Sequence, residues 1–119
     1  MSQNRVYLDY IRDMMESAEK ALQFIAGMKF EEFVEDEKTV YAVTRAIEII
    51  GEAARKIPID IRDTYPEIPW REIIGTRDKF IHDYFGIHLS VIWRTMQEDL
   101  QILVKQLKNM LDDFGYFLG

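Results

Sequence analysis

The chain has 119 residues, of which 48% are hydrophobic and 13% aromatic, and its formal net charge is −6. This composition is typical of one globular domain, here spanning residues 1–119, with a single hydrophobic core. No apolar run approaches the roughly 20 residues of a membrane span, and the first residues do not resemble a signal peptide. We therefore expect a soluble protein of one domain.

The chain has no cysteine and only two histidines, which excludes disulfides, thiolate nucleophiles and cysteine-based zinc sites. This composition fits a cytoplasmic protein, and any catalysis must use histidine, arginine, carboxylates or hydroxyls. The negative charge argues against a general nucleic-acid binder, because non-specific affinity comes mainly from lysine and arginine neutralising phosphates. A function on nucleic acid therefore requires a local basic site, for which Arg71, Arg77 and Lys79 are candidates.

Apolar residues recur at spacings of three and four along three long segments, which predicts amphipathic helices. These segments cover residues 8–25, 40–57 and 89–114. A fourth helix is predicted over residues 70–86. No β-hairpin or flexible linker is indicated, so the sequence predicts an all-α, up-and-down bundle of four to five helices.

Glycine and proline mark the ends of the predicted helices. Gly27 follows the first apolar stripe, Pro58 ends the second, and we expect Pro69 in the first turn of the next helix. The acidic segment 30–39 is predicted to be a connector with about one helical turn. Asp36 in this segment is a candidate N-cap for the second long helix.

The predicted helix over residues 70–86 carries an arginine in the middle of its apolar face. At about 100° per residue, Arg77 lies among Ile73, Ile74, Phe80, Ile81, Tyr84 and Phe85. Because a guanidinium keeps its charge, it needs a carboxylate, a helix C-terminus, a subunit boundary or an anionic ligand. His82 lies four residues after Asp78, so Asp78 can accept a hydrogen bond from the Nδ1–H of His82 and fix its tautomer.

His82 lies five residues after Arg77, which places it about 140° away around the helix axis. The two side chains would meet on one phosphate most easily in a distorted helix, or where two copies of the chain meet about a two-fold axis. The alternative is structural: Arg77 pairs with Glu48 or Glu52, and Tyr84 belongs to the core. The residues alone leave both interpretations open.

Four residues of this helix also follow a known motif. They are an arginine, a polar residue, a histidine and a tyrosine in the stretch RDKFIHDY, namely Arg77, Asp78, His82 and Tyr84. This spacing resembles the signature of HEPN-domain ribonucleases. The stretches DEKTVYAVTRAIEIIGEAARKIP (36–58) and YPEIPWREIIGTRDKFIHDYFGI (65–87), with Trp93, are similar to the HepT branch of that family, the toxin half of HepT–MntA toxin–antitoxin pairs.

The resemblance implies a HEPN fold, a homodimer with the motif of both subunits in its cleft, and RNA cleavage without a metal or other cofactor. It also implies a partner, a small MntA-type nucleotidyltransferase antitoxin that can neutralise the toxin by transferring AMP to the motif tyrosine. Carried onto this chain, the acceptor is Tyr84. Two alternatives remain: a non-catalytic HEPN module that binds nucleotide or serves its nucleotidyltransferase as partner, and a purely structural helical dimer.

A ribonuclease without a metal needs a base for the 2′-hydroxyl, an acid for the leaving 5′-oxygen and positive charge at the phosphate. His82 titrates in the right range for either proton transfer. Arg77 matches two phosphate oxygens with its planar guanidinium. We assign Asp78 to orienting His82, and Tyr84 to contacting the RNA phosphate or stacking on a base.

Overall fold

The computed structural model describes residues 3–82 and 89–115, and the side chains of residues 7–76 and 89–115. Every regular element in this part of the chain is helical, which confirms the predicted all-α class. The elements are α1 (Gln3–Phe24), α2 (Phe30–Glu35), α3 (Glu37–Arg55), α4 (Ile59–Thr64), α5 (Trp70–His82), α6 (Leu89–Arg94), the π-helical turn η1 (Thr95–Asp99) and α7 (Leu100–Asp113). None of these helices is long and apolar enough to cross a membrane.

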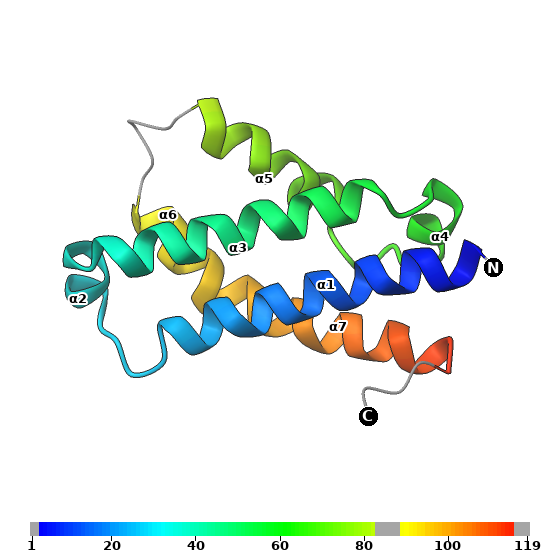
Figure 1. Ribbon diagram of the computed structural model, residues 1–119, viewed down its shortest axis with the longest axis horizontal. Coiled ribbons are helices and arrows are strands. Elements are labelled where there is room, and N and C mark those ends of the chain that lie inside the picture. The colour runs from blue at the N-terminus through cyan, green and yellow to red at the C-terminus, as the bar shows by residue number, and fades with distance from the viewer. Residues whose placement is uncertain (1–2, 83–88, 116–119) are drawn as a thin grey trace.

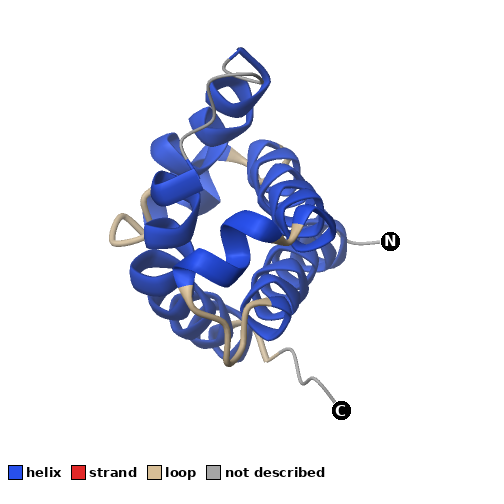
Figure 2. Cartoon of the chain, turned by 90° about the vertical axis from the view of Figure 1, so that its left-hand side faces the viewer, coloured by secondary structure: helices blue, strands red, loops and turns tan. Residues whose placement is uncertain are grey.

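The long helices lie side by side, and α1 packs against both α3 and α7. In the view of Figure 1, α1 lies between α3 and α7, while α5 lies on the other side of α3. The short helix α2 contacts α3 and α6 and lies across one end of the bundle (Figure 2). Helix α5 therefore has one long helical neighbour, α3, and is the outermost long helix.

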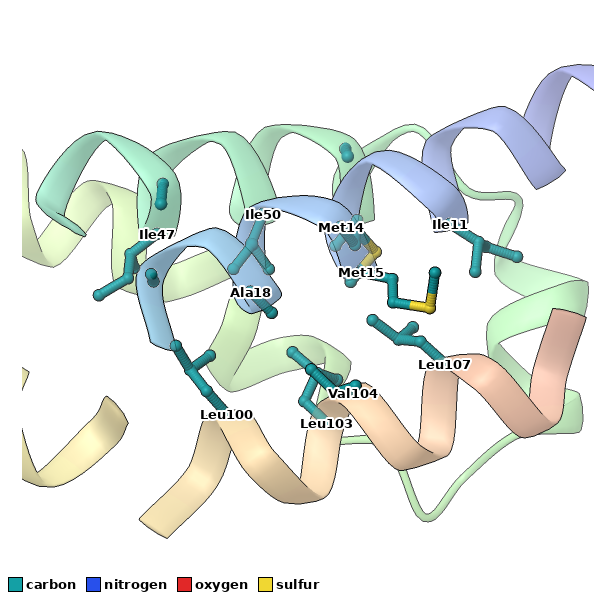
Figure 3. Packing of buried hydrophobic residues seen from close by; sticks show 14 of the residues in the cluster. Ile11, Met14, Met15, Ala18, Ile47, Ile50, Leu100, Leu103, Val104 and Leu107 are labelled. Carbon is teal, nitrogen blue, oxygen red and sulfur yellow. The ribbon is translucent and has the colours of Figure 1, made fainter. Parts of the chain in front are cut away.

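The core is formed by the apolar faces that the sequence spacing predicts. Figure 3 shows buried side chains of α1, α3 and α7 meeting between the helices: Ile11, Met14, Met15, Ala18, Ile47, Ile50, Leu100, Leu103, Val104 and Leu107. Burying a side chain of this size contributes roughly 1.5–3 kcal/mol, so the three stripes together are the main source of stability.

Two predicted helix ends are confirmed. Gly27, in the turn that follows α1, has a positive φ of 78°, a conformation that favours glycine. Asp36 accepts a hydrogen bond from the backbone N–H of Thr39 at 3.1 Å, and this bond lowers the pKa of Asp36. The expectation for Pro69 was wrong by one residue: α5 begins at Trp70, and the Pro69 carbonyl accepts the first helical bond, from Ile73 N at 3.0 Å.

The helix predicted over residues 89–114 contains a π-helical turn, η1, which the spacing of its apolar residues does not predict. The buried residues across it are Ile92, Met96 and Leu100, at successive spacings of four. At η1 the helix widens to π-type hydrogen bonding, while these three side chains stay buried on the side of the core.

We predict that Phe33 holds α2 onto the bundle. Its side chain is 0% exposed, and its ring centroid lies 5.2 Å from that of Trp93. Phe33→Ala should lower the free energy of unfolding by about 3–5 kcal/mol in urea denaturation, because it leaves a cavity. Val34→Ala, at a neighbouring side chain that is 39% exposed, is the matched control and should change it by about 0.5 kcal/mol or less. Equal effects of the two substitutions would contradict this packing.

Candidate functional site

The start of α5 is fixed by two buried side chains, Ile68 and Trp70, which are 2% and 8% exposed. The Trp70 indole Nε1 donates a hydrogen bond to the Tyr65 carbonyl at 3.0 Å, and the Trp70 backbone N–H donates to the Ile68 carbonyl at 2.8 Å. The polar tip of the indole is therefore satisfied within the turn that leads into the helix. Trp70 is thus a core anchor at the start of α5.

The loop before α5 is also tied to α7, at two points. The Tyr65 hydroxyl donates to Asp113 Oδ2 at 2.9 Å, and Gln106 Nε2 donates to the Glu67 carbonyl at 3.1 Å. Burial, followed by the hydrogen bond to Asp113, raises the pKa of Tyr65 to about 12. The loop is thus held to α7 by contacts between residues far apart in the sequence, and this fixes the direction in which α5 leaves the bundle.

The motif positions follow from this anchored start. Arg77, Asp78 and His82 all lie within the one continuous helix α5, as the sequence predicts, and position 77 comes one turn after Ile73, which packs against the core. The side chains of these three residues lie outside the described part of the structure, and Tyr84 lies outside the described residues altogether. Their catalytic and AMP-acceptor assignments therefore stay predictions.

The carboxylates proposed as structural partners of Arg77 lie on α3 and contact another arginine. Arg45 NH1 lies 3.3 Å from Glu48 Oε2 and 3.7 Å from Glu52 Oε1. All three side chains are partly exposed, so these ion pairs are worth little individually. The two glutamates thus already have a cationic neighbour on their own helix, which weakens the case that they require Arg77.

An apolar cavity of about 320 Å³ lies on one side of α5, between that helix, α3, η1 and α7. Its floor includes Ile47, Ile50 and Leu103, and three carboxylates line it: Glu67, Glu72 and Asp99. Local sequence patterns do not predict this cavity, because its lining comes from segments far apart in the chain. Of the three carboxylates, Asp99 is the last residue of η1.

The fold and the site define a class: an all-α protein that presents an arginine, an acidic residue and a histidine on one helix of a bundle. The family model described as "Ribonuclease HepT-like" matches residues 14–110. The chain belongs to this HepT-like family of HEPN-type ribonucleases.

Three relatives illustrate the similarity. The chain is 48% identical over 99 residues to "Probable ribonuclease HepT" of Thermococcus cleftensis, covering 83% of this chain and 90% of the relative. It is 39% identical over 111 residues to a "Putative RNase" of Caldanaerobacter subterraneus, covering 93% and 96%. It is 38% identical over 104 residues to a "Putative RNase" of Methanocaldococcus jannaschii, covering 87% and 86%. No solved structure matches the chain significantly.

We predict that the Tyr65 hydroxyl stabilises the approach to α5. Tyr65→Phe keeps the ring but removes the bond to Asp113, so it should cost about 0.5–1.5 kcal/mol of unfolding free energy at pH 7. The folded pKa of about 12 lies above the ordinary value of 10.0, so the contribution of Tyr65 is complete below pH 10 and is lost as the pH rises towards 12.

Urea denaturation of the wild type and Tyr65→Phe at several pH values measures both effects. The difference between the two proteins should be constant from pH 7 to 9 and should fall above pH 10. A difference that stays constant across that range would show that the hydroxyl titrates normally in the folded protein.

Proposed function

We propose that the protein is the toxin ribonuclease of a HepT–MntA type pair, and that it cleaves RNA without a metal ion. The observation that carries the proposal is the placement of Arg77, Asp78 and His82 on one continuous helix, in a chain that belongs to the HepT-like family. Relatives named as ribonucleases that align over most of their length support the RNA substrate.

The geometry of α5 favours a site shared by two copies of the chain. Positions 77 and 82 are five residues apart, so they diverge by about 140° around an undistorted helix. One copy therefore cannot easily bring both side chains to one phosphate. A homodimer that places two α5 helices face to face across a two-fold axis supplies Arg77 from either helix and two histidines.

The chemistry then follows from these groups. Neutral His82 takes the proton from the 2′-hydroxyl, and the 2′-oxygen attacks the phosphorus to form the 2′,3′-cyclic phosphate. The bond from phosphorus to the 5′-oxygen breaks, and the leaving oxygen takes its proton from His82 of the partner subunit in its protonated form. Arg77 stabilises the charge on the phosphorane oxygens, and Asp78 orients His82.

We expect His82→Ala to lower the rate constant for cleavage of a labelled RNA by about 10²–10⁴-fold, the usual loss for a general acid or base. Arg77→Ala should cost about 10²–10³-fold, because it removes charge stabilisation in the transition state. His88→Ala and Arg94→Ala are the matched controls, since they change the same residue types outside the motif and should leave cleavage nearly unchanged. Circular dichroism must show that every variant is folded.

Equal activity of His82→Ala and His88→Ala would remove the motif from the mechanism. Lack of cleavage by the wild type, with binding to the nucleotidyltransferase retained, would favour the non-catalytic partner module instead.

The proposal includes neutralisation by a MntA-type antitoxin that modifies Tyr84. In this step the Tyr84 oxygen attacks the α-phosphorus of ATP. The bond from the α-phosphorus to the oxygen that bridges to the β-phosphate breaks, and pyrophosphate leaves. The hydroxyl proton passes to solvent or to a base on the nucleotidyltransferase. The product carries a bulky, negatively charged AMP group seven residues after Arg77. An anion there would compete with RNA phosphate for the arginine and block the site sterically.

We expect the wild type treated with ATP and its nucleotidyltransferase to gain one AMP and lose cleavage activity. Tyr84→Phe should gain none, although five of the six tyrosines remain. Peptide mass spectrometry locates the modification, and phosphodiesterase digestion should restore both the original mass and the activity. AMP on a different tyrosine would contradict the assignment of Tyr84.

A further inference from the structure

A second hollow, of about 390 Å³, lies between α4 and α5. It is lined by Ile59, Arg62, Asp63, Trp70, Arg71, Ile74 and Gly75. Two arginines and one carboxylate give it a net positive lining, whereas the cavity on the other side of α5 is lined by three carboxylates and no basic residue among the described side chains. The two flanks of the motif helix therefore carry opposite charge.

Arg62 is held in place within this hollow. Its Nε donates a hydrogen bond to the Ile57 carbonyl at 2.9 Å, and the side chain is half-buried. One of its five N–H donors is thereby used, and the bond orients the guanidinium without neutralising it. Among the described side chains, Arg62 forms no ion pair, so its charge is available to an anion that enters the hollow.

Arg71 lies opposite, on α5, and is exposed. The described side chains include no ion-pair partner for it either. In a helix, position 78 follows position 71 by about two turns, and position 82 follows by about three, so the three positions share one side of α5. The hollow thus lies along the helix from the motif, on the flank where positions 78 and 82 fall.

The hollow also offers an apolar surface. Ile59 is 66% exposed at its edge, the highest value among the large exposed hydrophobic residues of the described chain, and Ile74 is half-buried beside it. Trp70 contributes to the wall but is almost fully buried, which leaves the aliphatic side chains as the surface that a flat ring could lie on. Cationic groups beside an apolar surface suit a nucleotide, which has an anionic phosphate and an apolar base face.

We infer that this hollow holds the single-stranded RNA next to the scissile phosphate, with Arg62 and Arg71 contacting its phosphates and Ile59 supporting a base. The inference rests on the proposed ribonuclease function and adds a path for the substrate. Arg62 and Arg71 act as positioning residues: they bind the strand and take no part in the proton transfers. The carboxylate-lined flank repels phosphate, so the strand extends over the α4 side only.

The test compares Arg71→Ala with Lys20→Ala, which removes the same charge from an exposed position on α1. For single strands, log K falls with log salt by about 0.7 for each neutralised phosphate. At about 0.1 M salt, one lost contact should therefore raise KM about fivefold, leave kcat unchanged, and reduce the salt slope by about 0.7. Lys20→Ala should change none of these, and Arg71→Lys should restore most of the affinity.

Arg62→Ala should behave like Arg71→Ala, but it also removes the bond to Ile57. Arg62→Lys retains the charge without that bond, so it separates a loss of RNA contact from a loss of local structure. Equal KM and salt slope in Arg71→Ala and Lys20→Ala would overturn the inference. So would a fall in kcat with unchanged KM, or weaker binding to the nucleotidyltransferase with unchanged RNA binding.

Fluorescence anisotropy with a labelled single-stranded oligonucleotide in excess EDTA separates this inference from the proposed function. If the wild type binds the oligonucleotide, with the predicted loss in Arg71→Ala, but does not cleave it, the ribonuclease proposal fails while the binding surface remains. If the wild type cleaves and Arg71→Ala binds normally, the binding surface fails while the ribonuclease proposal remains.

Discussion

The burial of Ile68 and Trp70 at the start of α5 is the contact on which the candidate site depends. Helix α5 is the outermost long helix, with α3 as its long neighbour, so its position is set mainly by how it begins. The hydrogen bonds of Tyr65 to Asp113 and of Gln106 to Glu67 hold the preceding loop to α7. Through these contacts the core of α1, α3 and α7 determines where the backbone of residues 77–82 lies. A loss of the anchor should therefore reduce activity without changing any motif residue.

The division of charge across α5 offers a physical answer to how so acidic a chain would bind RNA. A net charge of −6 disfavours RNA over most of the surface, but charge acts locally where salt screens beyond about 10 Å. Arg62 and Arg71 lie on one flank of the helix, and Glu67, Glu72 and Asp99 lie on the other. Such an arrangement directs an anionic strand to one side, and it makes the expected affinity modest and sensitive to salt. By the same argument, the flank lined by Glu67, Glu72 and Asp99 attracts cationic groups and repels RNA phosphate.

The sequence predicts the parts of this structure that depend on local patterns. Spacings of three and four identify the long helices, and the cap at Asp36 and the glycine at position 27 mark two ends correctly. The π turn η1 was not predicted, because the fourfold spacing of Ile92, Met96 and Leu100 is also compatible with an ordinary α-helix. The bond from Tyr65 to Asp113 joins residues 48 positions apart, and Arg62 and Arg71 line one hollow although they come from different helices. The motif could be found from its spacing, but the proposed dimeric site depends on how two copies would meet, which periodicity within one chain cannot determine.

The most direct test of the account is the chemistry of the RNA ends produced in excess EDTA. The unmodified wild type, with its intact mass confirming that Tyr84 carries no AMP, is incubated with an end-labelled single-stranded RNA, and the products are mapped. A histidine and arginine site acting on the 2′-hydroxyl predicts cleavage that resists the chelator and leaves 2′,3′-cyclic phosphate and 5′-hydroxyl ends. Cleavage that requires added Mg²⁺, or that leaves 5′-phosphate and 3′-hydroxyl ends, would contradict the account, because water activated by a metal would then be the nucleophile in place of the 2′-oxygen.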